Sequence, residues 1–162
     1  MIDVVTAPSP MDTETPLIRV GEQLRTQIRF TREQITQFAV LSGDSNPLHH
    51  DRIAAERASF GEIIASGQQT ASRMMGLVAS HFSRDGDGVV REMLCLNFNF
   101  AFKAPVFAEQ ELHVAWHVSA VDRSTRLGGF IGHLDGTASV GGRPCVIGRG
   151  TVLVRRPASR TS

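Results

Sequence analysis

The hydrophobic pattern of this chain changes its period once, and this change constrains the fold more than any other feature. Apolar side chains recur at helical spacing over residues 68–82, whereas from residue 94 onward they recur at every second position. The intervening Asp-Gly-Asp-Gly at 85–88 is typical of a turn. Spacings of three to four residues indicate an amphipathic helix, and strict alternation indicates a half-buried strand. The sequence therefore predicts helices before this turn and strands after it.

Three further elements are expected before the 68–82 helix. Residues 24–30 alternate between polar and apolar side chains and are predicted to form a strand. Thr31, with Gln34 three residues later, forms a capping box that opens a helix ending at Gly43. Asp51 is placed to cap a further short helix.

Four strand-like segments follow the turn, at residues 94–102, 112–118, 127–140 and 145–155. The first places Phe98, Phe100 and Phe102 on one face, which we expect to belong to the core. A run of strands kept apart from the helices predicts an α+β fold with a mostly antiparallel sheet. The apolar stripe of the 68–82 helix is suited to lie against that sheet. Open sheet edges are usually covered by a partner.

Composition excludes several classes of protein. Seventeen basic side chains against 16 acidic ones leave almost no net charge, and no Lys/Arg block stands out. Nothing therefore points to a nucleic-acid or membrane partner. No apolar run approaches the ~20 residues of a membrane span, and no secretion signal is evident, so we expect a cytoplasmic protein. Residues 1–16 and 157–162 are expected to be flexible tails, with a single domain over 17–156.

The cysteines and most histidines do not indicate a metal site. Cys95 and Cys145 lack metal-ligand spacing and are expected to be reduced core residues. His113 and His117 lie two positions apart on the polar face of one predicted strand, and no third ligand is evident. We predict that this face meets solvent or an interface, and that the protein binds no metal.

Residues 42–51, Ser-Gly-Asp-Ser-Asn-Pro-Leu-His-His-Asp, carry the clearest chemical signal. Asp44 and His49 stand on either side of a turn at Asn46-Pro47. Pro47 fixes its own φ and biases the preceding residue towards extended backbone, so the chain leaves helical geometry here. A carboxylate and an imidazole on a rigid loop are suited to acid–base work on a water molecule. The same residues also fit a helix cap followed by a solvated turn.

A second candidate group is the start of the 68–82 helix. Ser66 and Gln69 fit a capping box, which makes Gly67 the first helical residue, with an N–H that has no acceptor inside the helix. The missing side chain and the helix dipole make this N–H a candidate oxyanion donor. The alternative is an ordinary capped helix start in which Gly67 permits close packing.

Residues 38–49, Phe-Ala-Val-Leu-Ser-Gly-Asp-Ser-Asn-Pro-Leu-His, resemble the hydratase signature of the MaoC-like family, which contains the (R)-specific enoyl-CoA hydratases. Residues 64–72 and 100–107 are similar to two further family segments, and the three matches cover most of residues 18–155. The resemblance implies a hotdog fold, in which a curved, mostly antiparallel sheet wraps around a central helix. It also implies a homodimer or larger homo-oligomer.

The resemblance implies reversible hydration of a trans-2-enoyl thioester, on coenzyme A, to the (R)-3-hydroxyacyl thioester without a cofactor. His49 would take a proton from water, Asp44 would orient that water and return a proton, and the Gly67 N–H would bind the thioester carbonyl. Asn46 is also expected to hold the loop or the dyad through hydrogen bonds. The candidate substrate-binding residues are Asn46, Ser66, Gln68 and Ser72.

The sequence departs from the family pattern near the helix start. Ser66 replaces the usual His, and Gln68 and Gln69 occupy positions that are usually apolar. The two amides favour a short or polar acyl group, unless they face solvent or cap backbone. Arginines in the second half of the chain are candidates for the phosphates of a carrier arm, but spacing does not choose among them: Arg123, Arg126, Arg143 and Arg149.

Two other functions fit these residues. A dehydratase acting on a carrier-protein-bound hydroxyacyl chain would use the same dyad. A non-catalytic subunit that binds acyl thioesters is the alternative from a different class, because fold does not decide function. A thioesterase fits less well, since the Asp-x-Asn-Pro-x-His loop matches the hydratase branch.

Overall fold

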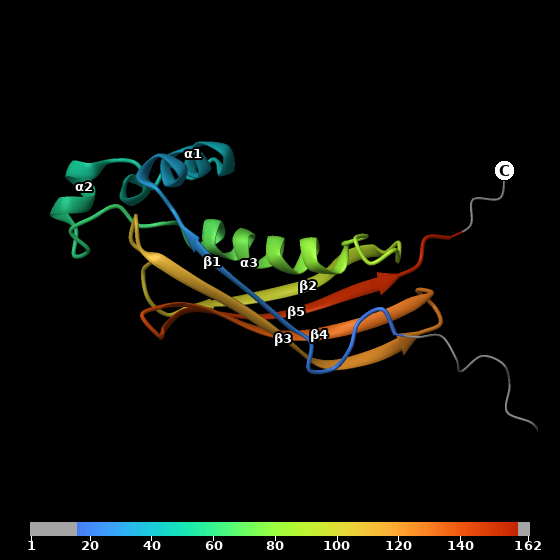
Figure 1. Cartoon of the computed structure of the whole chain (residues 1–162). Helices are drawn as coiled ribbons and strands as arrows, with labels where there is room; N and C mark the ends of the chain where they lie inside the picture. Colours follow the sequence, from blue (N-terminus) through green and yellow to red (C-terminus); the bar gives the residue numbers. More distant parts are fainter. Residues whose placement is uncertain (1–15, 159–162) are drawn as a thin grey trace, which may run out of the picture.

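Five strands form one antiparallel sheet in the computed structural model, which describes residues 16–158 (Figure 1). The strands are β1 (Gln23–Arg29), β2 (Glu92–Phe102), β3 (Glu111–Ser124), β4 (Gly129–Val140) and β5 (Arg143–Arg155). Their order in the sheet is β1-β3-β4-β5-β2, and each neighbouring pair is antiparallel. Most of the two expected tails lies outside the described residues.

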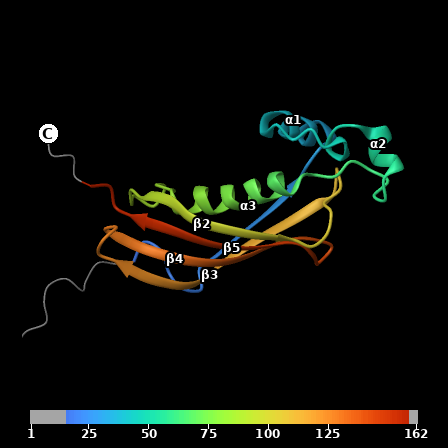
Figure 2. The same cartoon turned by 180° about the vertical axis from the view of Figure 1, so that it is seen from behind.

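The helices occupy one side of this sheet. They are α1 (Arg32–Ser42), the 3-10 turn η1 (Pro47–His49), α2 (Arg52–Arg57) and α3 (Gly67–Phe82). The long helix α3 lies along the curved sheet and contacts all five strands, while α1 and α2 overhang one end (Figures 1 and 2). This confirms the predicted α+β architecture. No helix within residues 16–158 combines the length and apolar character needed to cross a bilayer.

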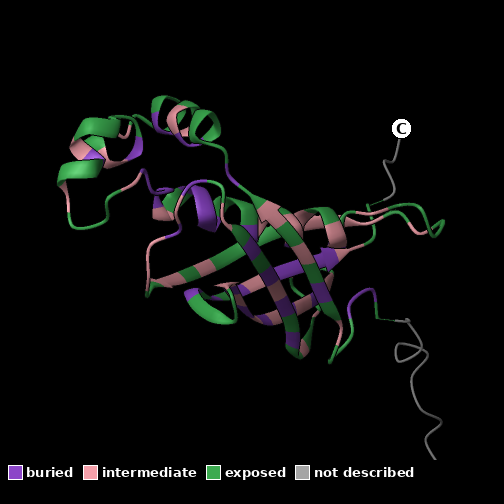
Figure 3. Ribbon diagram, turned by 60° about the vertical axis from the view of Figure 1, so that its left-hand side comes forward, coloured by how far each residue is buried: buried purple, intermediate pink, exposed green. Residues whose placement is uncertain are grey.

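The core lies between α3 and the inner face of the sheet. Strand β3 alternates as predicted, with its four apolar positions from Leu112 to Val118 buried (Figure 3). The indole N–H of Trp116 donates to the Met74 carbonyl of α3 at 3.0 Å. A Cβ at Gly136 or Gly148 would lie 2.3 or 2.7 Å from this indole ring, so glycine lets the ring lie flat against β4 and β5. One hydrogen bond and close packing therefore hold α3 on the sheet.

The prediction for Phe102 is wrong. Phe98 and Phe100 are partly buried and pack against the core, but Phe102 is 56% exposed. It is the last residue of β2, which is an edge strand of the sheet formed by residues 16–158, so no other strand of that range covers its outer side. The alternation of apolar residues correctly predicted which face of β2 carries Phe102. It could not predict that the packed core ends before this residue.

The prediction that Cys95 is a core residue is also wrong. Both cysteines are free, and Cys145 is buried, whereas Cys95 is exposed. The register of β2 against β5 shifts between Cys95 and Asn97, a local bulge on the edge strand. Leu94 and Leu96 beside it are 48% and 46% exposed, which leaves an apolar strip along this edge.

Candidate active site

The loop that carries Asp44 and His49 begins at a well-defined helix end. Gly43 caps α1 in the left-handed region, with φ at 70°, where glycine has little steric cost. The N–H of Asp44 returns to the Ala39 carbonyl at 2.9 Å. The helix thus ends at the predicted residue, and Asp44 leaves it in a fixed direction.

Side-chain hydrogen bonds then close the turn. Asp44 Oδ1 accepts the Asn46 N–H at 3.0 Å, and Asn46 Oδ1 accepts the Leu48 N–H at 3.2 Å. Pro47 opens η1, where its missing N–H leaves no donor unsatisfied. The Asn46 side chain therefore holds the loop, and it is not among the residues that line the adjacent cavity.

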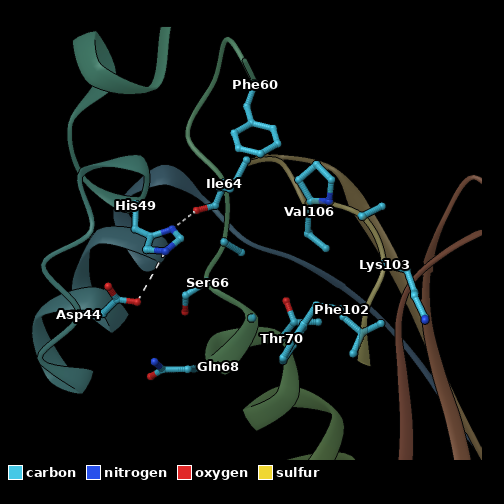
Figure 4. Close-up of a pocket in the computed structure, with 15 residues that line it drawn as sticks. Asp44, His49, Phe60, Ile64, Ser66, Gln68, Thr70, Phe102, Lys103 and Val106 are labelled. Atoms are coloured by element: carbon cyan, nitrogen blue, oxygen red, sulfur yellow. Dashed lines mark hydrogen bonds and ion pairs between the residues drawn. The ribbon is translucent and has the colours of Figure 1, made fainter. Parts of the chain in front are cut away.

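The ring of His49 is buried and has a defined orientation. It is 6% exposed, and its Nδ1 lies 2.7 Å from the Ile64 carbonyl oxygen (Figure 4). A carbonyl only accepts, so Nδ1 carries the proton and Nε2 of the neutral ring has a free lone pair. Nε2 faces Asp44 Oδ2 at 3.6 Å, beyond hydrogen-bond length. A water molecule beside this gap can donate one hydrogen bond to each of the two atoms.

An extended segment at residues 63–66 supports this ring. The Ile64 N–H donates to the Leu48 carbonyl at 3.2 Å, so Ile64 is bonded to the loop through both of its backbone groups. Next to it, the Ala65 N–H donates to the Val106 carbonyl at 2.8 Å. The loop that carries Asp44 and His49 is thereby tied to the segment that leads into β3. The anchoring role of Ile64 had no sequence signal, because it depends on pairing across the fold.

An ion pair strengthens the same connection on the outside. Nε and Nη2 of Arg32 donate to the two carboxylate oxygens of Glu62. This pair joins the start of α1 to the segment before Ile63. The hydrogen bonds from Arg32 lower the pKa of the Glu62 carboxyl to about 2. A backbone hydrogen bond from Ile63 acts in the same direction.

The start of α3 departs from the predicted capping box in one half. Ser66 is buried, and its hydroxyl accepts the Gln69 N–H at 3.1 Å, as predicted. The Gln69 side chain does not return to Ser66 but donates to the Gln34 carbonyl of α1 at 3.2 Å. Tertiary contact with α1 has therefore replaced the local cap.

Gly67 is the first residue of α3 and faces the cavity. A Cβ at this position would lie 2.7 Å from the Phe102 ring. Close packing against Phe102 therefore explains why this position is glycine. The same position also leaves the Gly67 N–H without an acceptor inside the helix. Phe102 becomes a wall of the site rather than part of the core.

Asp44, His49 and Gly67 line one cavity of about 520 Å³, together with Ser66 and Gln68 (Figure 4). Sequence reasoning missed several of its walls. These include Phe60, Thr70, Phe102, Lys103 and Val106. Lys103 is the only lysine in the chain. This rarity is the one feature of the sequence that could have drawn attention to it.

The structure does not bring every predicted residue to this cavity. Ser72 is exposed and lines a different cavity between α1 and α3, because five residues of helix after Gly67 turn it to another face. The arginines considered for carrier phosphates do not line the cavity either. Arg123 instead lies over the Phe130 ring, and Arg149 lies beside Asp135.

Comparisons with known proteins agree with this geometry. A family model for the MaoC like domain matches residues 16–130. The (R)-specific enoyl-CoA hydratase of Aeromonas caviae is 32% identical over 104 residues, which are 64% of this chain and 73% of that protein. A mitochondrial 3-hydroxyacyl-[acyl-carrier-protein] dehydratase of Arabidopsis thaliana is 31% identical over 96 residues, 59% of this chain and 53% of that protein.

Solved structures agree at the level of the fold. The (R)-hydratase from A. caviae involved in PHA biosynthesis matches with a TM-score of 0.72 at 29% identity, covering 86% of this chain and 98% of that one. The names of both curated relatives denote hydro-lyases, the enzyme class that the sequence predicted. The family model, these relatives and the curved sheet around α3 together establish that the chain belongs to the MaoC-like domain family and has a hotdog fold.

Proposed function

We propose that this chain hydrates a trans-2-enoyl thioester, as the coenzyme A derivative, to the (R)-3-hydroxyacyl thioester, and catalyses the reverse dehydration. One observation carries the proposal: His49 Nε2 and Asp44 Oδ2 meet at 3.6 Å in a cavity that also contains the start of α3. The relatives named as an enoyl-CoA hydratase and a 3-hydroxyacyl dehydratase support the same reaction class.

The thioester carbonyl would bind at the Gly67 N–H. This donor lies at the positive end of the α3 dipole, where negative charge that develops on the oxygen is stabilised. Withdrawal of charge through the carbonyl makes C3 electrophilic. Phe60, Ile64 and Phe102 provide apolar walls, which limit competing water and strengthen this electrostatic effect.

The water molecule would bind beside the dyad, in hydrogen-bond contact with both groups. His49 Nε2 takes one of its protons as the oxygen bonds to C3, and the π electron pair of the C2=C3 double bond moves towards the carbonyl to give the thioester enolate. The proton held by the dyad then reaches C2 through Asp44. One water is consumed, and the protein returns to its starting protonation state. The Ile64 carbonyl stabilises the charged ring by accepting the hydrogen bond from its Nδ1–H group.

Lys103 is the candidate contact for the carrier arm. It is exposed, lies next to Phe102 and lines the cavity. A flexible ammonium suits a phosphate that arrives from solvent. Coenzyme A and a carrier protein both bring a phosphate on their arm, so this contact is compatible with either.

The function is tested with crotonyl-CoA and purified protein, by following the absorbance of the conjugated thioester and identifying the enantiomer formed. We expect loss of absorbance and an (R)-3-hydroxybutyryl product. A parallel assay with crotonyl-carrier protein decides the carrier by comparing kcat/KM. Binding without turnover of any short, branched or dicarboxylic enoyl thioester would contradict hydration and support the non-catalytic alternative.

We also propose a homodimer formed along the β2 edge. This edge has no neighbouring strand among the described residues, and Leu94, Leu96 and Phe102 expose apolar surface along it. Unpaired strand edges with apolar side chains favour pairing with another chain. Within each protomer, residues 17–156 would form a single domain.

A further inference from the structure

One polar side chain in the cavity of the Asp44/His49 dyad has no part in the hydration steps above. Thr70 lines this cavity from α3, and the whole residue is 1% exposed. Hydroxyl side chains on a helix can donate to the carbonyl four residues earlier, as Ser42 and Ser83 do near their helix ends. The Thr70 hydroxyl does not, and it forms no other hydrogen bond within residues 16–158.

The hydroxyl oxygen of Thr70 is open to the cavity. Over the described part of the chain, the side-chain N and O atoms that are both unpartnered and closed off from solvent are Gln69 Oε1 and Arg91 Nε. The Thr70 oxygen also lacks a partner, but unlike those two atoms it retains surface that solvent can reach. In Figure 4 it points away from α3 and into the cavity. A group of the size of water, such as a carbonyl oxygen, can therefore contact it.

Thr70 shares a helix face with Gly67, the proposed donor to the thioester carbonyl. Three residues separate the two positions, which is close to one helical turn. Helical side chains lean towards the N-terminus, so the Thr70 hydroxyl lies over the first turn of α3, which begins at Gly67. Two donors therefore face the same part of the cavity, a backbone N–H and a hydroxyl whose proton has no acceptor among the described residues.

This part of the cavity suits the thioester group rather than the acyl chain. A Cβ at Gly67 would lie 2.7 Å from the Phe102 ring, and the exposed Lys103 follows Phe102. In the view of Figure 4, Thr70 lies between His49 and Lys103. A substrate with C3 at His49 and its carrier arm at Lys103 would place its carbonyl between them. The thioester carbonyl is therefore the group that the Thr70 hydroxyl would meet.

We propose that the Thr70 hydroxyl is a second oxyanion donor, which binds the thioester carbonyl together with the Gly67 N–H. This inference rests on the hydration proposed above. Negative charge develops on the carbonyl oxygen as water adds to C3, and a hydrogen bond to a charged acceptor is stronger than one to a neutral acceptor. The hydroxyl thus stabilises the transition state more than the bound substrate, which makes Thr70 a catalytic residue.

Two substitutions at Thr70 test this role in the crotonyl-CoA assay. Thr70→Val keeps the branched shape and removes the hydroxyl. It should lower kcat about 10- to 100-fold and change KM less than about threefold, because the Gly67 N–H remains as one donor. Thr70→Ser keeps the hydroxyl and should restore kcat to within about fivefold of the parent protein. Thr137→Val, on β4 and outside this cavity, is the matched control and should leave both constants within about twofold.

The kinetic pattern separates this role from others. A Thr70→Val protein that kept its kcat, with or without a higher KM, would overturn the proposal, because uniform binding does not act on the chemical step. Equal losses in the Val and Ser variants would also overturn it, since both would then report packing.

Thermal unfolding tests whether the hydroxyl has a structural partner. Removal of an unpartnered hydroxyl from a buried residue costs the fold nothing, so the Tm of Thr70→Val should equal or exceed that of the parent protein. A clear fall in Tm would show that the hydroxyl holds the structure instead, and the proposal would be wrong.

Infrared spectroscopy of bound butyryl-CoA, isotopically labelled at the carbonyl carbon, separates this inference from the hydration. This thioester is saturated and cannot be hydrated, so its carbonyl stretch reports hydrogen bonds without turnover. We expect binding to the parent protein to lower the frequency, and binding to Thr70→Val to lower it less. That result without turnover of crotonyl-CoA by the parent would refute the hydration and keep the Thr70 contact. Equal shifts in the two proteins, or no bound band, would refute the contact itself.

Discussion

At the scale of single residues, the proposed chemistry depends on how His49 is held. The local motif contains the ring and the carboxylate, but the contact that orients the ring comes from Ile64, fifteen residues later. Asp44 and His49 were predictable together because one short loop carries both. Ser72 was not predictable in the same way, since its position depends on which face of α3 meets the cavity.

Lys103 allows a prediction about substrate affinity. Replacing Lys103 with Gln should raise the KM for crotonyl-CoA about 3- to 10-fold and leave kcat nearly unchanged, because a phosphate contact far from C2 and C3 stabilises substrate and transition state equally. Steady-state kinetics at low and high salt measure both constants. Arg126→Gln, in the turn between β3 and β4, is the matched control. An equal fall in kcat and kcat/KM would instead indicate a role in the chemical step.

At the scale of elements, local signals predicted most of the helices and strands. The Thr31 capping box and the Gly43 cap define α1 at both ends, and Asp51 caps α2 through the Ala54 N–H. These signals are hydrogen bonds between near neighbours, so sequence contains them. The predicted capping box of α3 forms only its Ser66 half, because the Gln69 side chain donates to α1 instead. A linear sequence pattern does not show such a competing tertiary contact.

The ion pair between Arg32 and Glu62 connects two such elements and predicts a pH dependence. The pKa of Glu62 is lowered from 4.5 to about 2, so the pair stabilises the fold fully above pH 4.5 and loses its effect as the pH falls towards 2. Glu62→Gln should therefore lower Tm at pH 7 by roughly 1–3 °C, as expected for a partly exposed pair. The difference from the parent protein should vanish near pH 2.

Thermal unfolding followed by circular dichroism across this pH range measures the effect. Glu56→Gln, which breaks an exposed pair with Arg52 inside α2, is the control and should change Tm less. A difference between Glu62→Gln and the parent that persisted at pH 2 would show that the carboxylate charge is not its cause.

At the scale of the whole molecule, the sequence predicted the helix layer and the sheet correctly, but not which strand lies at the edge of the sheet. The alternation of residues over β3 identified its buried face correctly, and the apolar stripe of α3 packs against the sheet as predicted. The order of strands was not predictable, and it alone makes β2 an edge. Phe102 and Cys95 were therefore expected inside and are found exposed.

The β2 edge predicts the assembly of the molecule. Leu96→Arg should shift the protein from dimer to monomer, because it places a charge on the apolar strip that we propose is buried between protomers. Light scattering coupled to gel filtration measures the mass directly. Val40→Arg, at an exposed apolar residue on α1, should leave the dimer intact. A dimer that survives Leu96→Arg, or a parent protein that is monomeric, would contradict this interface.

The central claim is that Asp44 and His49 hydrate an enoyl thioester, and its most direct test compares two adjacent histidines. His49→Gln removes the buried imidazole that we propose is the general base, whereas His50→Gln changes an exposed ring outside the cavity. In the crotonyl-CoA assay, we expect His49→Gln to lower kcat about 10²- to 10⁴-fold, the usual range for loss of a general base. Asp44→Asn should lower kcat by a similar factor, and the kcat of His50→Gln should stay within about twofold of that of the parent protein. Near-normal turnover by a folded His49→Gln protein would contradict the account.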